Sequence, residues 1–221
     1  MMKTSNKVTL ITDHPIASQS ADHLHPRGTM LDNTHCLPFV EACKRRVDEP
    51  SLLDLGCAGG GLVRDFLDVG FEAVGLEGSD YSQVNERAEW PMLPERLFTC
   101  DITKPFQLRK GSKKGSKMLF DFVTAWEVLE HIEIHDLGGL FDNVKRHMKP
   151  GGYFMASIAT FPDGPWHVTL RPKEHWLQWL KEHGFKLVDG LAEKEWPRGS
   201  ANGPGDWSGK ENGFHVACKI A

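Results

Sequence analysis

The chain has 221 residues, of which 40% are hydrophobic and 25% charged, and its formal net charge is −4 at pH 7. This length fits one domain that builds its own core. No apolar run reaches the roughly 18 residues of a membrane helix, and residues 8–11 are shorter than the core of about 7 to 15 residues in a secretory signal. We therefore predict a cytoplasmic protein without a membrane segment, whose acidic balance disfavours nucleic acid as a partner.

Short apolar segments alternate with helix-length stretches in the first two thirds of the chain. Strands are predicted at residues 52–55, 71–76, 95–100, 119–125 and 153–158. A helix is predicted over 136–148, because its apolar residues recur at helical spacing before Lys149-Pro150-Gly151-Gly152 stops it. Alternating strands and helices predict an α/β fold with a parallel sheet covered by helices on both faces.

The two ends of the chain depart from this alternation. An amphipathic helix from Cys36 to Val47 precedes the first strand, and the residues ahead of it are expected to be an irregular flap over the site. Near the C-terminus we predict a helix over 172–183, a segment at 185–188, a Gly/Pro-rich loop and a strand at 214–220. With no helix between the last two strands, they should pair antiparallel.

These features predict a single domain over residues 1–221. Its expected parts are an N-terminal flap and helix (1–48), a ligand-binding core (50–158), and a substrate-side loop, helix and terminal hairpin (159–221).

A glycine-rich turn, Asp54-Leu55-Gly56-Cys57-Ala58-Gly59-Gly60-Gly61, lies between the first core strand and its helix. Glycines there let the backbone approach a ligand and leave helix N-terminal amides free. Glu77 follows at the end of the next strand, where an acid usually accepts from ribose hydroxyls. The spacing fits neither the dinucleotide fingerprint nor a P-loop, so we expect a different nucleoside cofactor.

Five motifs in this order resemble the class I S-adenosylmethionine (SAM)-dependent methyltransferases. The resemblance implies a Rossmann-like, mostly parallel seven-stranded sheet with an antiparallel C-terminal strand, and SAM as the cofactor. Ala58 replaces the usual middle glycine of the turn. The matching segments are 54–60, Glu77 after 74–76, Asp101 after 99–100, Glu127-Val128-Leu129-Glu130-His131-Ile132, and Lys149-Pro150-Gly151-Gly152.

The resemblance also implies roles for the cofactor side. Residues 56–60 would contact the methionine and ribose, Glu77 the ribose hydroxyls, and Asp101 the adenine amino group. Two alternatives stay open: Asp101 could cap the turn 101–103, and Glu77 could be a solvent-facing charge. The predicted cofactor-binding residues are Asp54, Gly56, Cys57, Ala58, Gly59, Gly60, Glu77, Gly78, Ser79, Asp101, Ile102, Trp126 and Glu127.

The acceptor side should follow the fourth and fifth strands, because ligands gather at the carboxyl ends of parallel strands. If a helical turn starts at Glu127, Glu130 and His131 project from its same side. We predict His131, His167 and Glu130 as catalytic residues and expect the two imidazoles to approach one another.

Three interpretations of this acceptor cluster remain open. The residues could be purely structural, His131 or His167 could be a general base, or the cluster with Glu127 could hold a divalent metal. The E-x-x-E-H pattern resembles the metal motif of small-RNA 3′-end 2′-O-methyltransferases and ubiquinone-pathway O-methyltransferases. We assign no residue as a metal ligand, because the local sequence supplies only three.

The leading hypothesis is an enzyme that transfers a methyl group from SAM to oxygen or nitrogen of a small molecule or glycan. The [DNS]-P-P-[FYW] motif of base N-methyltransferases is missing after the fourth strand. One alternative is a metal-assisted 2′-O-methyltransferase of RNA ends, with the lysine-rich loop 110–117 on phosphates. A further alternative is a non-catalytic binding protein with the methyltransferase fold.

Overall fold

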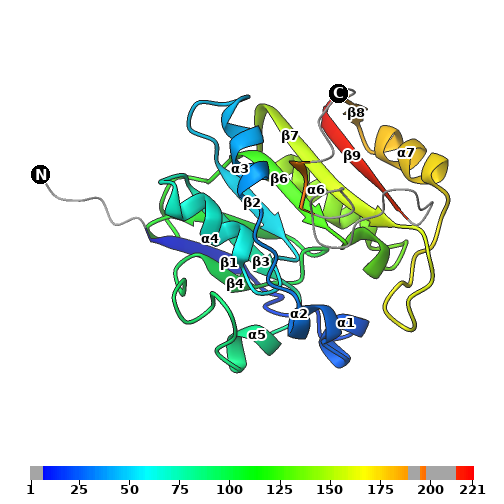
Figure 1. The fold of residues 1–221 in the computed structure, drawn as a ribbon, viewed down its shortest axis with the longest axis horizontal. Helices are drawn as coiled ribbons and strands as arrows, with labels where there is room; N and C mark the ends of the chain where they lie inside the picture. Colours follow the sequence, from blue (N-terminus) through cyan, green and yellow to red (C-terminus); the bar gives the residue numbers. More distant parts are fainter. Residues whose placement is uncertain (1–6, 189–194, 198–212) are drawn as a thin grey trace, which may run out of the picture.

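The computed structural model describes residues 7–188, 195–197 and 213–221. Its centre is a twisted sheet of seven strands in the order β4-β3-β2-β6-β7-β9-β8 (Figure 1). The strands are β2 (Leu52–Leu55), β3 (Ala73–Glu77), β4 (Leu97–Thr99), β6 (Phe120–Trp126), β7 (Met148–Ala159), β8 (Phe185–Leu187) and β9 (Gly213–Ile220).

The pairing confirms the predicted α/β class and its terminal exception. β4, β3, β2, β6 and β7 pair parallel in that order, whereas β9 pairs antiparallel with both β7 and β8. One boundary was wrong. Residues 149–152, expected to separate helix from strand, lie within β7, which begins at Met148.

Helices cover both faces of the sheet, as predicted. The helices are α3 (Leu37–Lys44), α4 (Gly61–Asp68), α5 (Tyr81–Val84), α6 (Leu137–His147) and α7 (Lys173–Glu182). Phe39 of α3 and Phe66 of α4 pack in one buried cluster, while Phe141 of α6 and Trp176 of α7 pack in the other. Leu52 and Leu53 of β2 belong to opposite clusters, because successive strand residues face opposite sides of a sheet.

The N-terminal region is more ordered than its sequence suggests. β1 (Val8–Thr12) pairs antiparallel with β5 (Phe106–Lys110) in a separate two-stranded sheet, and α1 (Ala21–Leu24) and α2 (Arg27–Leu31) follow. The expectation of an irregular segment before Cys36 was therefore wrong. Alternation at β1 is too short to reveal a partner about 100 residues away.

Two further predictions concern loops. The lysine-rich loop lies on the surface as expected, with Lys113 and Lys114 exposed. The predicted Gly/Pro-rich loop before β9 falls mostly outside the described residues. No helix in the described ranges is long and apolar enough to span a membrane.

The strand order fixes where a ligand can bind. The chain runs outward from β2 to β3 and β4, and then returns to β6 on the other side of β2. Loops diverge at this switch point and leave a crevice at the carboxyl ends of the strands. The segments after β2, β3, β6 and β7 all open toward this edge.

Candidate active site

The glycine-rich turn after β2 needs left-handed backbone at three positions. Gly56, Ala58 and Gly60 have φ values of 72°, 45° and 89°. A Cβ on Gly56 would lie 2.4 Å from a methyl of Val128, so the turn packs directly against the segment after β6. Ala58 adopts a conformation that costs an L-residue about 1 kcal/mol.

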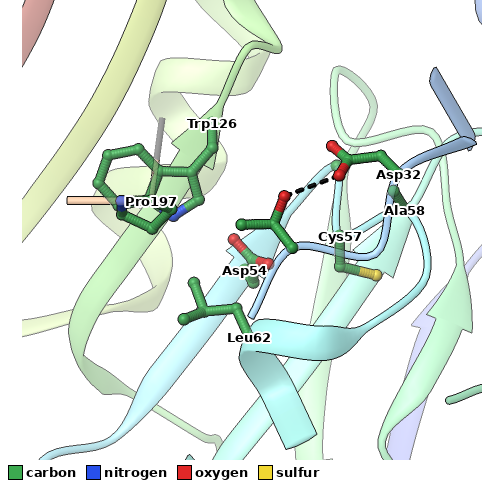
Figure 2. Close-up of a pocket in the computed structure, with 9 residues that line it drawn as sticks. Asp32, Asp54, Cys57, Ala58, Leu62, Trp126 and Pro197 are labelled. Carbon is green, nitrogen blue, oxygen red and sulfur yellow. Dashed lines mark hydrogen bonds between the residues drawn. The ribbon is translucent and has the colours of Figure 1, made fainter. Parts of the chain in front are cut away.

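A pocket opens between this turn and β6. Figure 2 shows Asp54, Cys57, Ala58 and Trp126 around it, with Asp32 from the N-terminal segment beside Ala58. The turn and Trp126, predicted separately as cofactor residues, thus share one pocket.

Two polar groups in this pocket are desolvated. Burial raises the pKa of Asp54 to about 7, although the Thr124 hydroxyl donates a 2.7 Å hydrogen bond to its Oδ1. The buried Nε1 of Trp126 has no hydrogen-bond partner within the described part of the chain. Asp54 therefore offers the pocket a buried carboxyl acceptor, and Trp126 offers it an unsatisfied N–H donor.

Glu77, at the end of β3, is only 6% exposed, so the solvent-facing alternative is wrong. Its carboxylate accepts from the backbone N–H of Ala58 at 2.7 Å and of Ser79 at 3.2 Å. Burial raises its pKa, and the two amides oppose that effect. Gly78 accepts a backbone hydrogen bond from Ala17, which brings the N-terminal segment to the same edge.

Asp101 caps the turn after β4, as one of the two open interpretations expected. Its Oδ1 accepts from the backbone N–H of Thr103 at 3.0 Å and from the Thr103 hydroxyl at 2.6 Å. Ile102 packs in the buried cluster beneath α6. A role for either residue toward adenine stays a prediction.

The chemistry of these groups fits SAM. Asp54 could accept from the ammonium of its methionine part, and the orphaned Trp126 N–H could donate to the carboxylate. Glu77 could accept from ribose hydroxyls, since a carboxylate has about four acceptor sites, and two backbone amides and the Thr29 hydroxyl use three of them.

The acceptor side begins at Glu127, which has a left-handed φ of 57°. Its backbone N–H donates to the Ser157 hydroxyl at 2.9 Å. The helical turn begins at Leu129 rather than at Glu127, as the 3₁₀ turn η1 (Leu129–His131). Burial, reinforced by the neighbouring charge of Glu130, raises the pKa of Glu127 to about 8.

Glu130, His131 and His167 meet in one cluster. One ligand atom from each residue lies within 4.8 Å of the others, and the two imidazole ring centres are 4.9 Å apart. The expectation that the two histidines approach one another is therefore confirmed. These three residues could hold a divalent metal or move a proton.

Each member of the cluster is oriented by a neighbour. Oε1 of Glu130 accepts from the Ala159 backbone at 2.8 Å, while its buried Oε2 has no partner in the described ranges. Nδ1–H of His167 donates to the Phe161 carbonyl at 2.6 Å. One buried carboxylate oxygen, Oε2 of Glu130, thus has no partner within the cluster.

His131 is surrounded by carboxylates. Burial lowers its pKa, but a hydrogen bond from Nδ1–H to Asp22 and the nearby charges of Glu130 and Glu127 outweigh burial and raise it to about 9. The ring is therefore cationic at neutral pH in this arrangement.

Asp22 and Asp32 are among the contributors to the site that sequence reasoning missed. Both lie in the stretch expected to be irregular, and no motif marks either residue. Their partners are remote: Asp22 contacts His131, 109 residues away, and the Asp32 carbonyl accepts from Arg87, 55 residues away. The only sequence signal was the general expectation of a flap over the site.

The fold and the site define a methyltransferase. A family model described as "Methyltransferase domain" matches residues 27–190, and the chain belongs to this family. The fold is that of the class I SAM-dependent methyltransferases, and SAM is their cofactor.

Relatives of known name match only part of their own length. An enzyme named ubiquinone biosynthesis O-methyltransferase from Paramagnetospirillum magneticum is 28% identical over 142 residues, which are 63% of this chain and 53% of the relative. A protein of the same name from Nitrobacter winogradskyi is 28% identical over 131 residues, 58% of this chain and 46% of the relative. The chain thus spans about half the length of these relatives.

Solved structures share the fold at low sequence identity. The glycopeptide N-methyltransferase MtfA in complex with S-adenosyl-L-homocysteine has a TM-score of 0.56 at 18% identity, covering 85% of this chain and 88% of that chain. The 1,6-didemethyltoxoflavin-N1-methyltransferase of Burkholderia thailandensis has a TM-score of 0.57 at 16% identity, covering 91% and 84%.

Proposed function

We propose that this protein transfers a methyl group from SAM to an oxygen or nitrogen atom of a small molecule or glycan. The observation that carries the proposal is the cluster of Glu130, His131 and His167 beside the pocket of Asp54 and Trp126, at one edge of the sheet. The names of the relatives and of the solved structures agree with small acceptors.

When bound, SAM supplies an electrophilic methyl group on a positively charged sulfonium. A cation in the same cleft disfavours the charged form of His131 and lowers its pKa from about 9 toward neutrality. In its neutral form His131 takes the acceptor's proton through Nε2, because Nδ1 is bonded to Asp22. Glu130 and His167 orient the acceptor, and positioning supplies most of the rate.

Two measurements test this proposal. Calorimetry should show micromolar binding of SAM or its demethylated product. Incubation with methyl-labelled SAM against fractionated metabolites, glycans and RNA should transfer label to a small molecule or glycan. Cofactor binding without transfer to any fraction would instead support the non-catalytic alternative.

A divalent metal is the second candidate mechanism, favoured by the unpartnered Oε2 of Glu130 beside two imidazoles. Activity after chelation and dialysis separates the two mechanisms. We expect activity to survive, because Asp22 already orients His131 for proton transfer without a metal ion. Loss of activity that Mg²⁺ or Mn²⁺ restores would establish the metal mechanism.

The RNA alternative is weakened by where the lysine-rich loop lies. This loop precedes Phe120, the first residue of β6, whereas Trp126 at the other end of β6 lines the pocket. A seven-residue strand spans about 20 Å, so the loop and the acceptor cluster lie at opposite ends of the sheet's parallel strands. The predicted cytoplasmic location rests on composition alone and stays a prediction.

A further inference from the structure

The N-terminal segment brings a carboxylate to the acceptor side. Asp22 lies in the first turn of α1, and its Oδ2 is 2.9 Å from Nδ1 of His131. The side chains of Asp22 and His131 are 23% and 19% exposed, so both are largely shielded from water. The family match begins at residue 27, so Asp22 lies ahead of the matched part of the chain.

We propose that Asp22 is a positioning residue for methyl transfer, which holds the Nδ1–H of His131 so that the Nε2 lone pair faces the acceptor. The inference rests on the proposed function. A carboxylate only accepts hydrogen bonds, so Nδ1 must carry the proton in this contact. The bond therefore selects one tautomer of the neutral ring and fixes the ring plane.

The other carboxylates near His131 do not perform this task. Oε1 of Glu130 accepts from Ala159, and Glu127 contacts Ser157. Among the described residues, Asp22 is the only carboxylate within hydrogen-bond distance of His131. His167 is oriented in the same sense, because its Nδ1–H donates to the Phe161 carbonyl. In both rings Nδ1 is engaged, so Nε2 is the nitrogen left for an acceptor.

Hydrogen bonds and an ion pair on either side of Asp22 hold it in position. The Ser20 hydroxyl caps α1 by accepting from the backbone N–H of His23 at 3.1 Å. Further along the segment, Arg27 pairs with Asp163 at 2.7 Å, and the Trp166 indole donates to the His25 carbonyl at 2.8 Å. These contacts anchor α1 to the loop after β7, which also carries His167.

The central experiment is a double-mutant cycle of Asp22→Ala and His131→Ala, with turnover, KM and cofactor affinity measured for each variant. Asp22→Ala alone should lower kcat between about 10- and 10⁴-fold, because a carboxylate that holds a general-base histidine in one tautomer contributes up to about 10⁴-fold. Cofactor affinity should stay within about twofold. In the His131→Ala background, Asp22→Ala should cause no further loss, because its only effect passes through the ring.

Asp80→Asn is the matched control. Asp80 lies 3.6 Å from His23, also on α1, but does not contact His131. This variant should keep wild-type turnover. If Asp22→Ala misfolds, Asp22→Asn preserves the size of the side chain and should still lower kcat, because an amide can also donate to Nδ1 and favour the wrong tautomer. Imidazole ¹⁵N shifts recorded above pH 9, where the ring is neutral, should show protonated Nδ1 in the wild type and a tautomer mixture in Asp22→Ala.

The outcomes separate this inference from the proposed function. Full activity of His131→Ala would overturn the general base itself. An inactive His131→Ala with a fully active Asp22→Ala would overturn only the positioning role. An additional loss on combining the two substitutions would also overturn it, since Asp22 would then act independently of His131.

Discussion

The cofactor side of the cleft takes its main polar groups from one continuous strand–turn–helix–strand unit, Leu52 to Glu77, with Trp126 as the chief addition. The acceptor side instead combines three segments that are far apart in the sequence: α1, the turn after β6 and the loop after β7. A continuous unit can be recognised from its spacing. A composite site depends on tertiary packing.

The two sides also differ in electrostatics. Glu77 is buried on the cofactor side, but two backbone amides satisfy its carboxylate. On the acceptor side, burial raises the pKa of both Glu127 and Glu130, and the charge of Glu130 raises that of Glu127 further. The carboxylates around His131 raise its pKa in turn. The cofactor side is organised for binding, and the acceptor side holds protons in a shared cluster, which suits proton transfer.

The largest expected effect tests the acceptor side. His131→Ala should lower kcat about 10²- to 10⁴-fold, the range for loss of one general base, and leave cofactor affinity unchanged. Steady-state kinetics and calorimetry measure the two quantities separately. His135→Ala is a suitable control, because that ring is exposed and lies outside the cluster. Wild-type turnover in His131→Ala would contradict the general-base hypothesis and leave His131 with a structural role.

His147 provides a contrast to His131, because its environment lowers its pKa whereas that of His131 is raised. His147 is fully buried and stacks on Phe106, and burial lowers its pKa to about 4. The unfolded chain, with a pKa near 6.5, binds more protons between these values. The contribution of His147 to stability should therefore be complete above pH 6.5 and fall by about 3 kcal/mol as pH drops to 4.

Denaturant unfolding across this pH window checks the expectation. His147→Phe keeps an aromatic ring beside Phe106 but cannot be protonated, so its stability should vary less with pH than that of the wild type. An equally steep acid loss in His147→Phe would assign the effect to other groups.

The difference between the two sides explains how far sequence reasoning could reach. The sheet, its antiparallel end and the cofactor turn follow from hydrophobic periodicity and from glycine spacing. The meeting of His131 and His167 follows from adjacent parallel strands, β6 and β7. Asp22 could not be found this way, since its place depends on contacts such as Arg27 with Asp163, 136 residues away.

Glu77 provides a smaller test, on the cofactor side. Glu77→Gln keeps the shape but removes the charge, and should weaken cofactor binding by roughly 1 to 3 kcal/mol through loss of charge-assisted hydrogen bonds. Calorimetry measures the change. Glu72→Gln is a control outside the pocket, because Glu72 pairs with Arg96. Equal affinities of Glu77→Gln and the wild type would remove Glu77 from the ribose site.

The smallest expected effect concerns the departure of the turn from the family pattern. Ala58 has a left-handed φ of 45°. Its backbone N–H donates to the Glu77 carboxylate, and its carbonyl accepts from the Trp90 indole. Ala58→Gly keeps both backbone bonds and relieves strain of about 1 kcal/mol, but glycine loses more backbone entropy on folding. The net gain in the free energy of unfolding should therefore be below about 1 kcal/mol, with cofactor affinity equal or higher.

Ala88→Gly is the matched control for this substitution. Ala88 is also left-handed, with a φ of 52°, but it is exposed and does not line the pocket. Denaturant unfolding should give both variants a similar small gain, because the backbone strain relieved is of the same kind. If Ala88→Gly gains stability while Ala58→Gly loses it, the Ala58 methyl contributes packing that outweighs its strain. Alanine would then stabilise the turn, and the middle glycine typical of the family would lower the free energy of unfolding of this protein.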